Sequence, residues 1–219
     1  MNKFPRSAYV HIPFCHRRCF YCDFAVIPLG NKVETLQGYG SKTVKEYLHF
    51  LYKEILSIKH KSPLSTIYIG GGTPSILDPK QIKEIIDLFK ENYGIDYGAE
   101  ITMEVDPASF NQDDLYGFIN AGINRFSLGV QSFNNQILQK SGRRHLREDA
   151  EKSCLWLKRV YDSGLIKSWS LDLIQNLPLS GFKEWQDDLK KTITFSPPHI
   201  SIYDLNIENG TVFKKLVNL

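Results

Sequence analysis

Short runs of apolar residues separated by longer amphipathic segments dominate the sequence. The short runs are rich in Val, Ile, Tyr, Phe and Trp, and most are bounded by Gly, Pro or Asp, which is typical of β-strands. Six strands are therefore expected, at residues 8–12, 66–69, 100–103, 125–128, 169–173 and 199–203.

Between these runs, apolar residues recur at three- and four-residue spacing, which predicts amphipathic helices. The helical segments cover residues 44–55, 82–89, 115–119, 150–161 and 185–193. Asp78 and Pro79 open the second of them as an N-cap and a first-turn proline. Because strands and helices alternate, the pattern predicts an α/β fold with a parallel sheet, either doubly wound or closed into part of a barrel.

In either arrangement, functional residues lie at the C-terminal ends of the strands. The chemically unusual residues of this chain fall at those ends: Cys15 to Cys22, Gly70 to Pro74, Glu104, Gln131, Asp172 and Asp204. Six loops that converge on one rim favour one composite active site.

The segment after the sixth expected strand, residues 206–219, is short, and no helix of ordinary length is expected in it. We therefore expect residues 1–219 to form one domain that stops soon after its sixth strand.

Composition and charge indicate which kinds of partner and which cellular location to expect. The chain has 27 Lys and Arg against 24 Asp and Glu, a net charge of +3, which argues against a nucleic-acid-binding surface. No apolar run approaches the roughly 20 residues of a membrane helix, and the N-terminus does not resemble a signal peptide. A cytoplasmic protein with no transmembrane segment is expected.

Three of the four cysteines, Cys15, Cys19 and Cys22, lie within eight positions, and this spacing indicates a metal site. Thiolates suit both iron–sulfur clusters and zinc, but a structural zinc site normally has four ligands, and the neighbouring His16 is not an obvious fourth. The triplet alone favours a cluster and leaves zinc open. Cys154 lies on the apolar face of a predicted helix and is expected to be a packed thiol.

Further sequence motifs surround the cysteine triplet and are spread over nearly the whole chain, from about residue 9 to residue 213. They are Tyr9-Val10-His11-Ile12-Pro13-Phe14-Cys15, Gly70-Gly71-Gly72-Thr73-Pro74-Ser75, Glu104-Val105-Asp106-Pro107, Gly129-Val130-Gln131-Ser132-Phe133, Gly142-Arg143-Arg144-His145, Leu171-Asp172-Leu173-Ile174 and Ile207-Glu208-Asn209-Gly210-Thr211. Together with the cysteines, they resemble the radical S-adenosylmethionine (radical SAM) enzymes. The similarity is to the branch that contains oxygen-independent coproporphyrinogen III oxidase and the related heme chaperones.

This resemblance implies a partial (β/α)6 TIM-like barrel, the radical SAM core. It also implies a [4Fe–4S] cluster on Cys15, Cys19 and Cys22, whose remaining iron chelates S-adenosylmethionine. The reduced cluster would cleave this molecule to a 5′-deoxyadenosyl radical, chemistry that belongs to the cofactors while the protein orients them.

Motif matching then assigns contacts to S-adenosylmethionine. The residues expected to contact it are Tyr9 near the cluster and the methionine end, Tyr21 beside the adenine, Gly71, Gly72 and Thr73 at the methionyl amine, Glu104, Gln131 and Asp172 at the ribose and amine, and Asn206 at a further position. Arg143 would pair with the carboxylate, to which a planar guanidinium offers two parallel donors.

One departure separates the two members of the branch. The oxidase has a further cysteine two positions after the last ligand, whereas here Phe24 follows Cys22-Asp23. The resemblance therefore favours the heme-chaperone type, with heme as a further ligand and a heme acceptor and an electron donor as unidentified partners. In that type the heme-binding motif is expected in a C-terminal region absent from this sequence. Two alternatives are an oxidase that decarboxylates the propionates of a porphyrinogen, and a zinc-stabilised α/β binding module.

Overall fold

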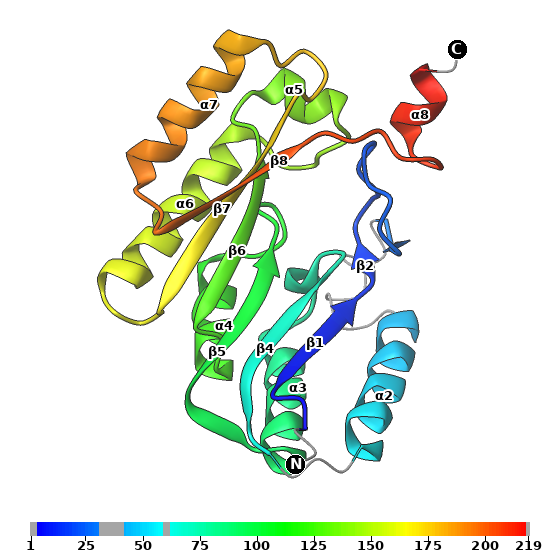
Figure 1. The fold of residues 1–219 in the computed structure, drawn as a ribbon, viewed down its shortest axis with the longest axis vertical. Helices are drawn as coiled ribbons and strands as arrows, with labels where there is room; N and C mark the ends of the chain where they lie inside the picture. The colour runs from blue at the N-terminus through cyan, green and yellow to red at the C-terminus, as the bar shows by residue number, and fades with distance from the viewer. Residues whose placement is uncertain (1–3, 31–41, 59–61, 218–219) are drawn as a thin grey trace.

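Six parallel strands form the central sheet of the computed structural model, which describes residues 4–30, 42–58 and 62–217 (Figure 1). They are β1 (Ser7–Ile12), β4 (Leu64–Gly71), β5 (Ile95–Val105), β6 (Arg125–Gln131), β7 (Ser168–Gln175) and β8 (His199–Asp204). Their spatial order follows the sequence, and β1 and β8 lie at the two ends of that order. All six expected strands are confirmed, and the sheet is an arc, as the prediction of a partial barrel requires.

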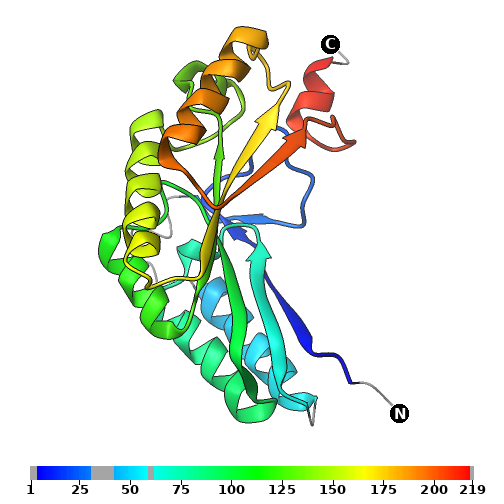
Figure 2. The same cartoon turned by 60° about the vertical axis from the view of Figure 1, so that its left-hand side comes forward.

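Five long helices cover one face of this arc (Figures 1 and 2). They are α2 (Lys42–Ser57), α3 (Pro79–Asn92), α4 (Gln112–Ala121), α6 (Arg147–Asp162) and α7 (Phe182–Phe195), which match the five helical segments of the sequence. Asp78 caps α3 as expected: its Oδ1 accepts from the Lys80 amide at 2.5 Å, and its own amide donates to Gln81 at 3.0 Å.

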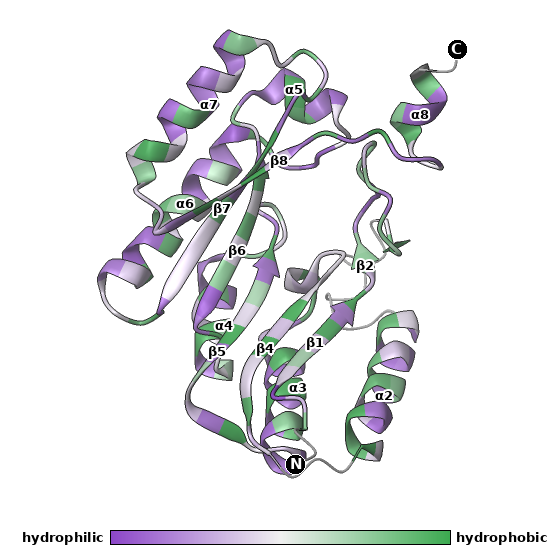
Figure 3. Cartoon of the chain, viewed as in Figure 1, coloured by the Kyte–Doolittle hydropathy of each residue, from purple (hydrophilic) through white to green (hydrophobic). Residues whose placement is uncertain are grey.

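The hydrophobic core lies between the sheet and these helices. Along β7, Trp169 and Leu171 are completely buried in that core, whereas Ser170 and Asp172 alternate with them on the opposite face. Strands β1, β4, β5 and β6 likewise have buried apolar positions towards the helices, whereas β8 has no buried residue (Figure 3). The inner face of the arc is therefore polar, unlike the interior of a complete TIM barrel, which bulky branched side chains fill.

Short elements that the sequence pattern did not reveal complete the fold. They are the two-stranded pair β2 (Phe14–Cys15) and β3 (Ile27–Pro28), the 3₁₀ turn η1 (Pro74–Ile76), α5 (Asn135–Lys140) and α8 (Val212–Val217). The expectation of no helix of ordinary length after the last strand agrees with the described residues, where only the short helix α8 forms. Helix α8 has only six residues, too few to show a helical period.

Within the described ranges, no helix is both long and apolar enough to cross a membrane. The organisation of residues 1–219 as one domain that stops after its sixth strand stays a prediction.

Candidate functional site

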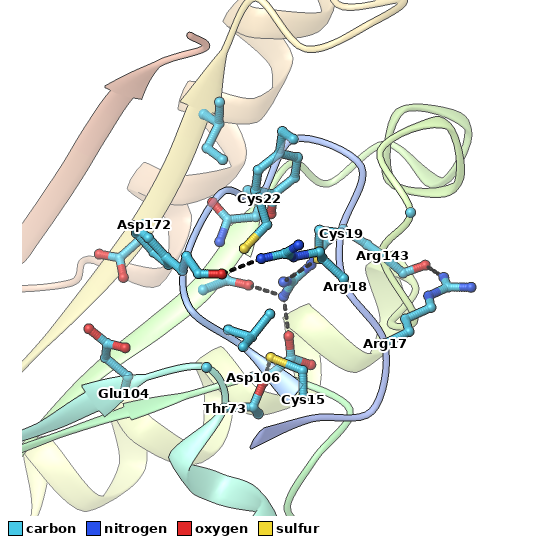
Figure 4. A pocket seen from close by; sticks show the side chains of 18 of the residues that line it. Cys15, Arg17, Arg18, Cys19, Cys22, Thr73, Glu104, Asp106, Arg143 and Asp172 are labelled. Carbon is cyan, nitrogen blue, oxygen red and sulfur yellow. Dashed lines mark hydrogen bonds and ion pairs between the residues drawn. The ribbon is translucent and has the colours of Figure 1, made fainter. Parts of the chain in front are cut away.

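A cavity of about 500 Å³ opens at the C-terminal ends of the strands (Figure 4). Of the thirteen site residues expected from the sequence, twelve line it: Cys15, Cys19, Tyr21, Cys22, Gly71, Gly72, Thr73, Glu104, Gln131, Arg143, Asp172 and Asn206. These residues come from all six strand ends and the loops that follow them, so the prediction of one composite site at this rim agrees with the geometry.

Tyr9 is the expected residue that does not line the cavity. Its side chain is exposed on the inner face of β1, where its ring stacks on Tyr68 at 6.0 Å between centroids. Its hydroxyl lies 3.1 Å from Nδ1 of His11. Tyr9 therefore contacts the site only indirectly: it stacks on Tyr68, whose hydroxyl donates to Glu104 in the cavity wall.

Cys15 ends β2, and Cys19 and Cys22 lie between β2 and β3. We call residues 15–26 the cysteine loop, and backbone hydrogen bonds fix it in place. The Phe20 amide donates to Ser141 O at 3.0 Å, and the Leu29 amide donates to Cys15 O at 2.8 Å. A Cβ on Gly142 would lie only 2.7 Å from the Phe20 ring, so only glycine lets the two loops approach this closely.

The three thiols are reduced and partly exposed to the cavity. Burial raises the pKa of Cys15 to about 11, even though Thr73 donates to its Sγ at 3.4 Å. Within the described segments, no three His, Cys, Asp or Glu side chains lie close enough together to hold a single metal ion.

The glycine turn after β4 packs its backbone against the cysteine loop. A Cβ on Gly72 would lie 2.6 Å from Phe14 O and 3.0 Å from Cys15 Sγ, and a Cβ on Gly71 would lie 2.6 Å from the His11 ring. Gly71 also has a φ of +116°, which an L side chain rarely adopts. The turn thus brings backbone, rather than side chains, to the edge of the cavity.

Glu104 and Asp172 place two carboxylates on the sheet side of the cavity. Glu104 accepts from the Tyr68 hydroxyl at 2.7 Å and from the Gly71 amide at 3.0 Å, and burial raises its pKa. Asp172 accepts from Ser127 Oγ at 2.7 Å through Oδ2, whereas its buried Oδ1 has no hydrogen-bond partner among the described residues. A buried carboxylate oxygen with a free acceptor position needs a donor, and a ligand in the cavity can supply it.

Gln131 ends β6 at an irregularity in the ladder, where the pairing with β7 shifts register between Gly129 and Gln131. Its φ is +68°, a left-handed conformation that costs a residue with a side chain about 1–3 kcal/mol. Such strain concentrates at functional sites, and here it accompanies a side chain at the cavity wall.

Arg143 is mostly buried, and its guanidinium is already engaged inside the protein. It forms an ion pair with Asp106 and donates to Gly129 O at 2.7 Å, while its Nη1 lies 3.6 Å from Cys19 Sγ. Although burial opposes the ionised form of Asp106, the Arg143 charge lowers the pKa of that carboxyl below its usual value. The pairing of Arg143 with a ligand carboxylate stays a prediction.

Asp106 and Ser127 line the cavity, and His145 lies behind Arg143, but none of the three was assigned a role from the sequence. Asp106 and His145 belong to quoted motifs, and that position was their only signal. Ser127 belongs to no motif and is recognisable only through Asp172, the partner that tertiary structure gives it.

Similar proteins were found by sequence and by structure. The heme chaperone HemW of Synechocystis sp. is 42% identical over 212 residues, covering 96% of this chain and 50% of that protein. The heme chaperone HemW of Haemophilus influenzae is 39% identical over 209 residues, covering 95% of this chain and 53% of that protein. The chain thus spans about half the length of the curated relatives that it matches.

Among solved structures, coproporphyrinogen III oxidase from Escherichia coli, a radical SAM enzyme, superposes with a TM-score of 0.78 at 27% identity. The match covers 98% of this chain and 52% of that one. Residues 9–171 also match the family model described as the radical SAM superfamily. This match spans the cysteine loop, the glycine turn and most of the strand-end cavity, and the chain belongs to the radical SAM superfamily.

Proposed function

We propose that the chain is the core of a cytoplasmic, heme-chaperone-type radical SAM protein. In this proposal Cys15, Cys19 and Cys22 hold a [4Fe–4S] cluster, and S-adenosylmethionine binds beside it in the strand-end cavity. The observation that carries the proposal is the convergence of the three thiols, the glycine turn and the strand-end carboxylates on that one cavity.

The residues present fit these two cofactors. Thiolates are the usual ligands of iron–sulfur clusters, and three of them leave one iron of a cubane without a protein ligand. The turn at Gly71 and Gly72 presents backbone beside Cys15, and Asp172 Oδ1 is a buried acceptor that lacks a donor. S-adenosylmethionine offers ammonium and hydroxyl donors that match such acceptors.

When bound, the reduced cluster supplies the electron that cleaves S-adenosylmethionine. The chain's own residues bind and orient that molecule. Glu104, which Tyr68 and the Gly71 amide hold in one orientation, can accept from an ammonium or hydroxyl group. Asp172 and Gln131 extend the same polar wall, and Tyr21 and Asn206 line the cavity where the adenine and a further ligand contact are proposed.

Anaerobic reconstitution with iron and sulfide tests the cluster. We expect about four irons per chain and a broad absorption band near 400 nm. Both should be lost in Cys19→Ala and kept in Cys154→Ser, because Cys154 is completely buried on α6, away from the cavity. Iron that survives Cys19→Ala, or that disappears with Cys154→Ser, would refute the ligand assignment.

A second candidate function is the oxidative decarboxylation of a porphyrinogen. The structural similarity to coproporphyrinogen III oxidase favours it, whereas Phe24 stands where the resemblance described in the sequence analysis implies a cysteine in that oxidase. Heme titration and a porphyrinogen turnover assay distinguish the two functions. Each assay should be run on this chain and on the full-length Synechocystis relative, because the chain spans about half of it. Turnover by both proteins would favour the oxidase.

A further inference from the structure

His145 lies behind Arg143 in the wall of the cavity and is 1% exposed. Both of its ring nitrogens have partners: Nε2 lies 3.1 Å from Val130 O, and Nδ1 lies 3.2 Å from Arg143 Nη2. A carbonyl oxygen only accepts, so Nε2 must carry the hydrogen. Nδ1 is therefore the acceptor, and the ring is a neutral imidazole that receives a hydrogen bond from Arg143.

The contacts of Arg143 are divided between the two ends of its guanidinium. Nη2 is directed to Asp106, Gly129 O and His145, while Nη1 is directed to Cys19 Sγ. Figure 4 shows Arg143 between Asp106 and Cys19. Because the guanidinium is planar and rigid, fixing Nη2 also fixes the direction of Nη1. Together with Asp106 and Gly129 O, His145 thus helps to orient, through Arg143, a donor that points at one of the three thiols.

Hydrogen bonds to cysteine sulfur are among the features that set the reduction potential of an iron–sulfur cluster. A donor that carries a positive charge stabilises the more negative, reduced form. Groups behind the ligands tune a metal centre in the same manner by orienting what touches it.

We propose that His145 is a positioning residue that holds Nη1 of Arg143 against Cys19 Sγ and thereby makes the cluster easier to reduce. This inference rests on the cluster proposed above. It differs from a purely structural role for His145, because it depends on the acceptor at Nδ1 rather than on the volume of the ring.

The first test uses the apoprotein and does not depend on the cluster. In the full chain with ¹⁵N-labelled histidine, NMR at pH 7 should show His145 with its hydrogen on Nε2 and with Nδ1 unprotonated. The signal is assigned by its loss in His145→Gln. A hydrogen on Nδ1 would overturn the proposal, because Arg143 would then have no acceptor on the ring.

The second test compares His145→Asn, whose amide oxygen can take the place of Nδ1, with His145→Gln, which reaches Val130 O but lacks that acceptor. His199→Gln is the matched control, since His199 is exposed on β8 and does not line the cavity. The reduction potential is measured by electron paramagnetic resonance during redox titration, in the absence of S-adenosylmethionine.

We expect His145→Gln to lower the equilibrium constant for one-electron reduction about tenfold, which corresponds to about 59 mV. His145→Asn and His199→Gln should stay close to the original protein, with iron content unchanged in every variant. Equal potentials for His145→Gln and the original protein, or equal shifts for Gln and Asn, would overturn the inference. If the original protein takes up no iron, the proposed function fails, and the tautomer still decides whether His145 positions Arg143.

Discussion

At the scale of single residues, the cavity combines backbone strain with unfilled acceptor positions. Gln131 adopts a φ of +68° at the end of β6, and Asp172 has a buried oxygen without a partner among the described residues. Each of these features lowers the stability of the folded chain. We expect that ligand binding compensates for this loss.

The strain at Gln131 leads to a prediction about stability and binding together. Gln131→Gly should raise the free energy of unfolding by about 0.5–1 kcal/mol, because glycine adopts this backbone conformation without a steric cost. It should also weaken S-adenosylmethionine binding about tenfold, because a hydrogen-bonding side chain is lost. Urea unfolding and equilibrium binding to the reconstituted protein measure the two effects.

Leu179→Gly is the control for this prediction, because Leu179 has a φ of +70° and is exposed outside the cavity. It should raise stability without changing S-adenosylmethionine affinity. If Gln131→Gly leaves the affinity unchanged as well, Gln131 has no role in binding.

At the scale of strands and helices, the one-sided core explains which elements the sequence could predict. The five long helices and every strand of the central sheet except β8 have a buried and an open face, so their periods of 3.6 and two residues are visible in the sequence. Strand β8 has no buried residue and was recognised by its β-branched and aromatic residues. Helices α5 and α8, with six residues each, are too short to show such a period.

For the site, prediction from the sequence depended on motifs and not on periodicity. The residues that belong to recognisable motifs, such as the cysteines and Glu104, could be assigned from the sequence. Ser127 could not, because its partner Asp172 is close to it only in the folded chain. His145 lies in a motif beside Arg143, but its contact with Val130 O, which settles which ring nitrogen accepts, exists only in the folded chain. The same limit explains why the ion pair between Arg143 and Asp106 was not expected from the sequence.

Adjacent residues on β4 test the one-sided core directly. Ile67 is 1% exposed and faces the helices, whereas Thr66 is exposed on the inner face. Ile67→Ala should lower the free energy of unfolding by about 2–5 kcal/mol. Thr66→Ala should change it by less than about 0.5 kcal/mol, as is usual for surface substitutions. Similar losses in urea unfolding for the two variants would show that the inner face is packed.

Helix α8 covers the cysteine loop, and this contact predicts how firmly the loop holds its ligand. Phe213 is buried, its ring meets those of Phe20 and Tyr21 at 6.2 and 6.5 Å, and its amide donates to Phe20 O at 3.0 Å. Phe213→Ala should undock the helix and make the loop open more often. We expect iron to pass to a chelator about tenfold faster, a ratio that corresponds to about 1.4 kcal/mol of opening free energy.

Leu216→Ala is the matched variant on the same helix, because Leu216 is 58% exposed. Its rate of iron release should equal that of the original protein. Equal rates for Phe213→Ala and Leu216→Ala would show that α8 does not stabilise the cysteine loop.

At the scale of the whole molecule, buried titratable groups beside the cavity link folding to pH. Burial, and then the neighbouring Arg143 charge, lower the pKa of His145 to about 4. The unfolded chain has an ordinary histidine pKa of about 6.5, so it takes up a proton over a pH range in which the folded chain does not. The stability from neutral His145 is therefore complete above about pH 6.5 and is lost as the pH falls towards 4.

Two carboxyl groups beside the cavity, those of Asp106 and Glu104, also have shifted pKa values that link stability to pH. The lowered pKa of Asp106 contributes stability that is lost only as the pH falls below the ordinary aspartate range. The raised pKa of Glu104 acts in the opposite direction, because protonation in the folded chain becomes easier as the pH falls. A comparison of the original protein with a His145 variant at the same two pH values isolates His145, because both proteins keep Glu104 and Asp106.

Urea unfolding of the apoprotein at pH 8 and pH 5 provides this comparison. The original protein should lose about 2 kcal/mol through His145 between these two values, a loss that His145→Asn should not show. His199→Asn, at an exposed position, should lose as much stability as the original protein. If His145→Asn loses the same amount too, the pKa of His145 is not lowered in the folded chain, and burial and Arg143 do not hold the ring neutral at pH 5.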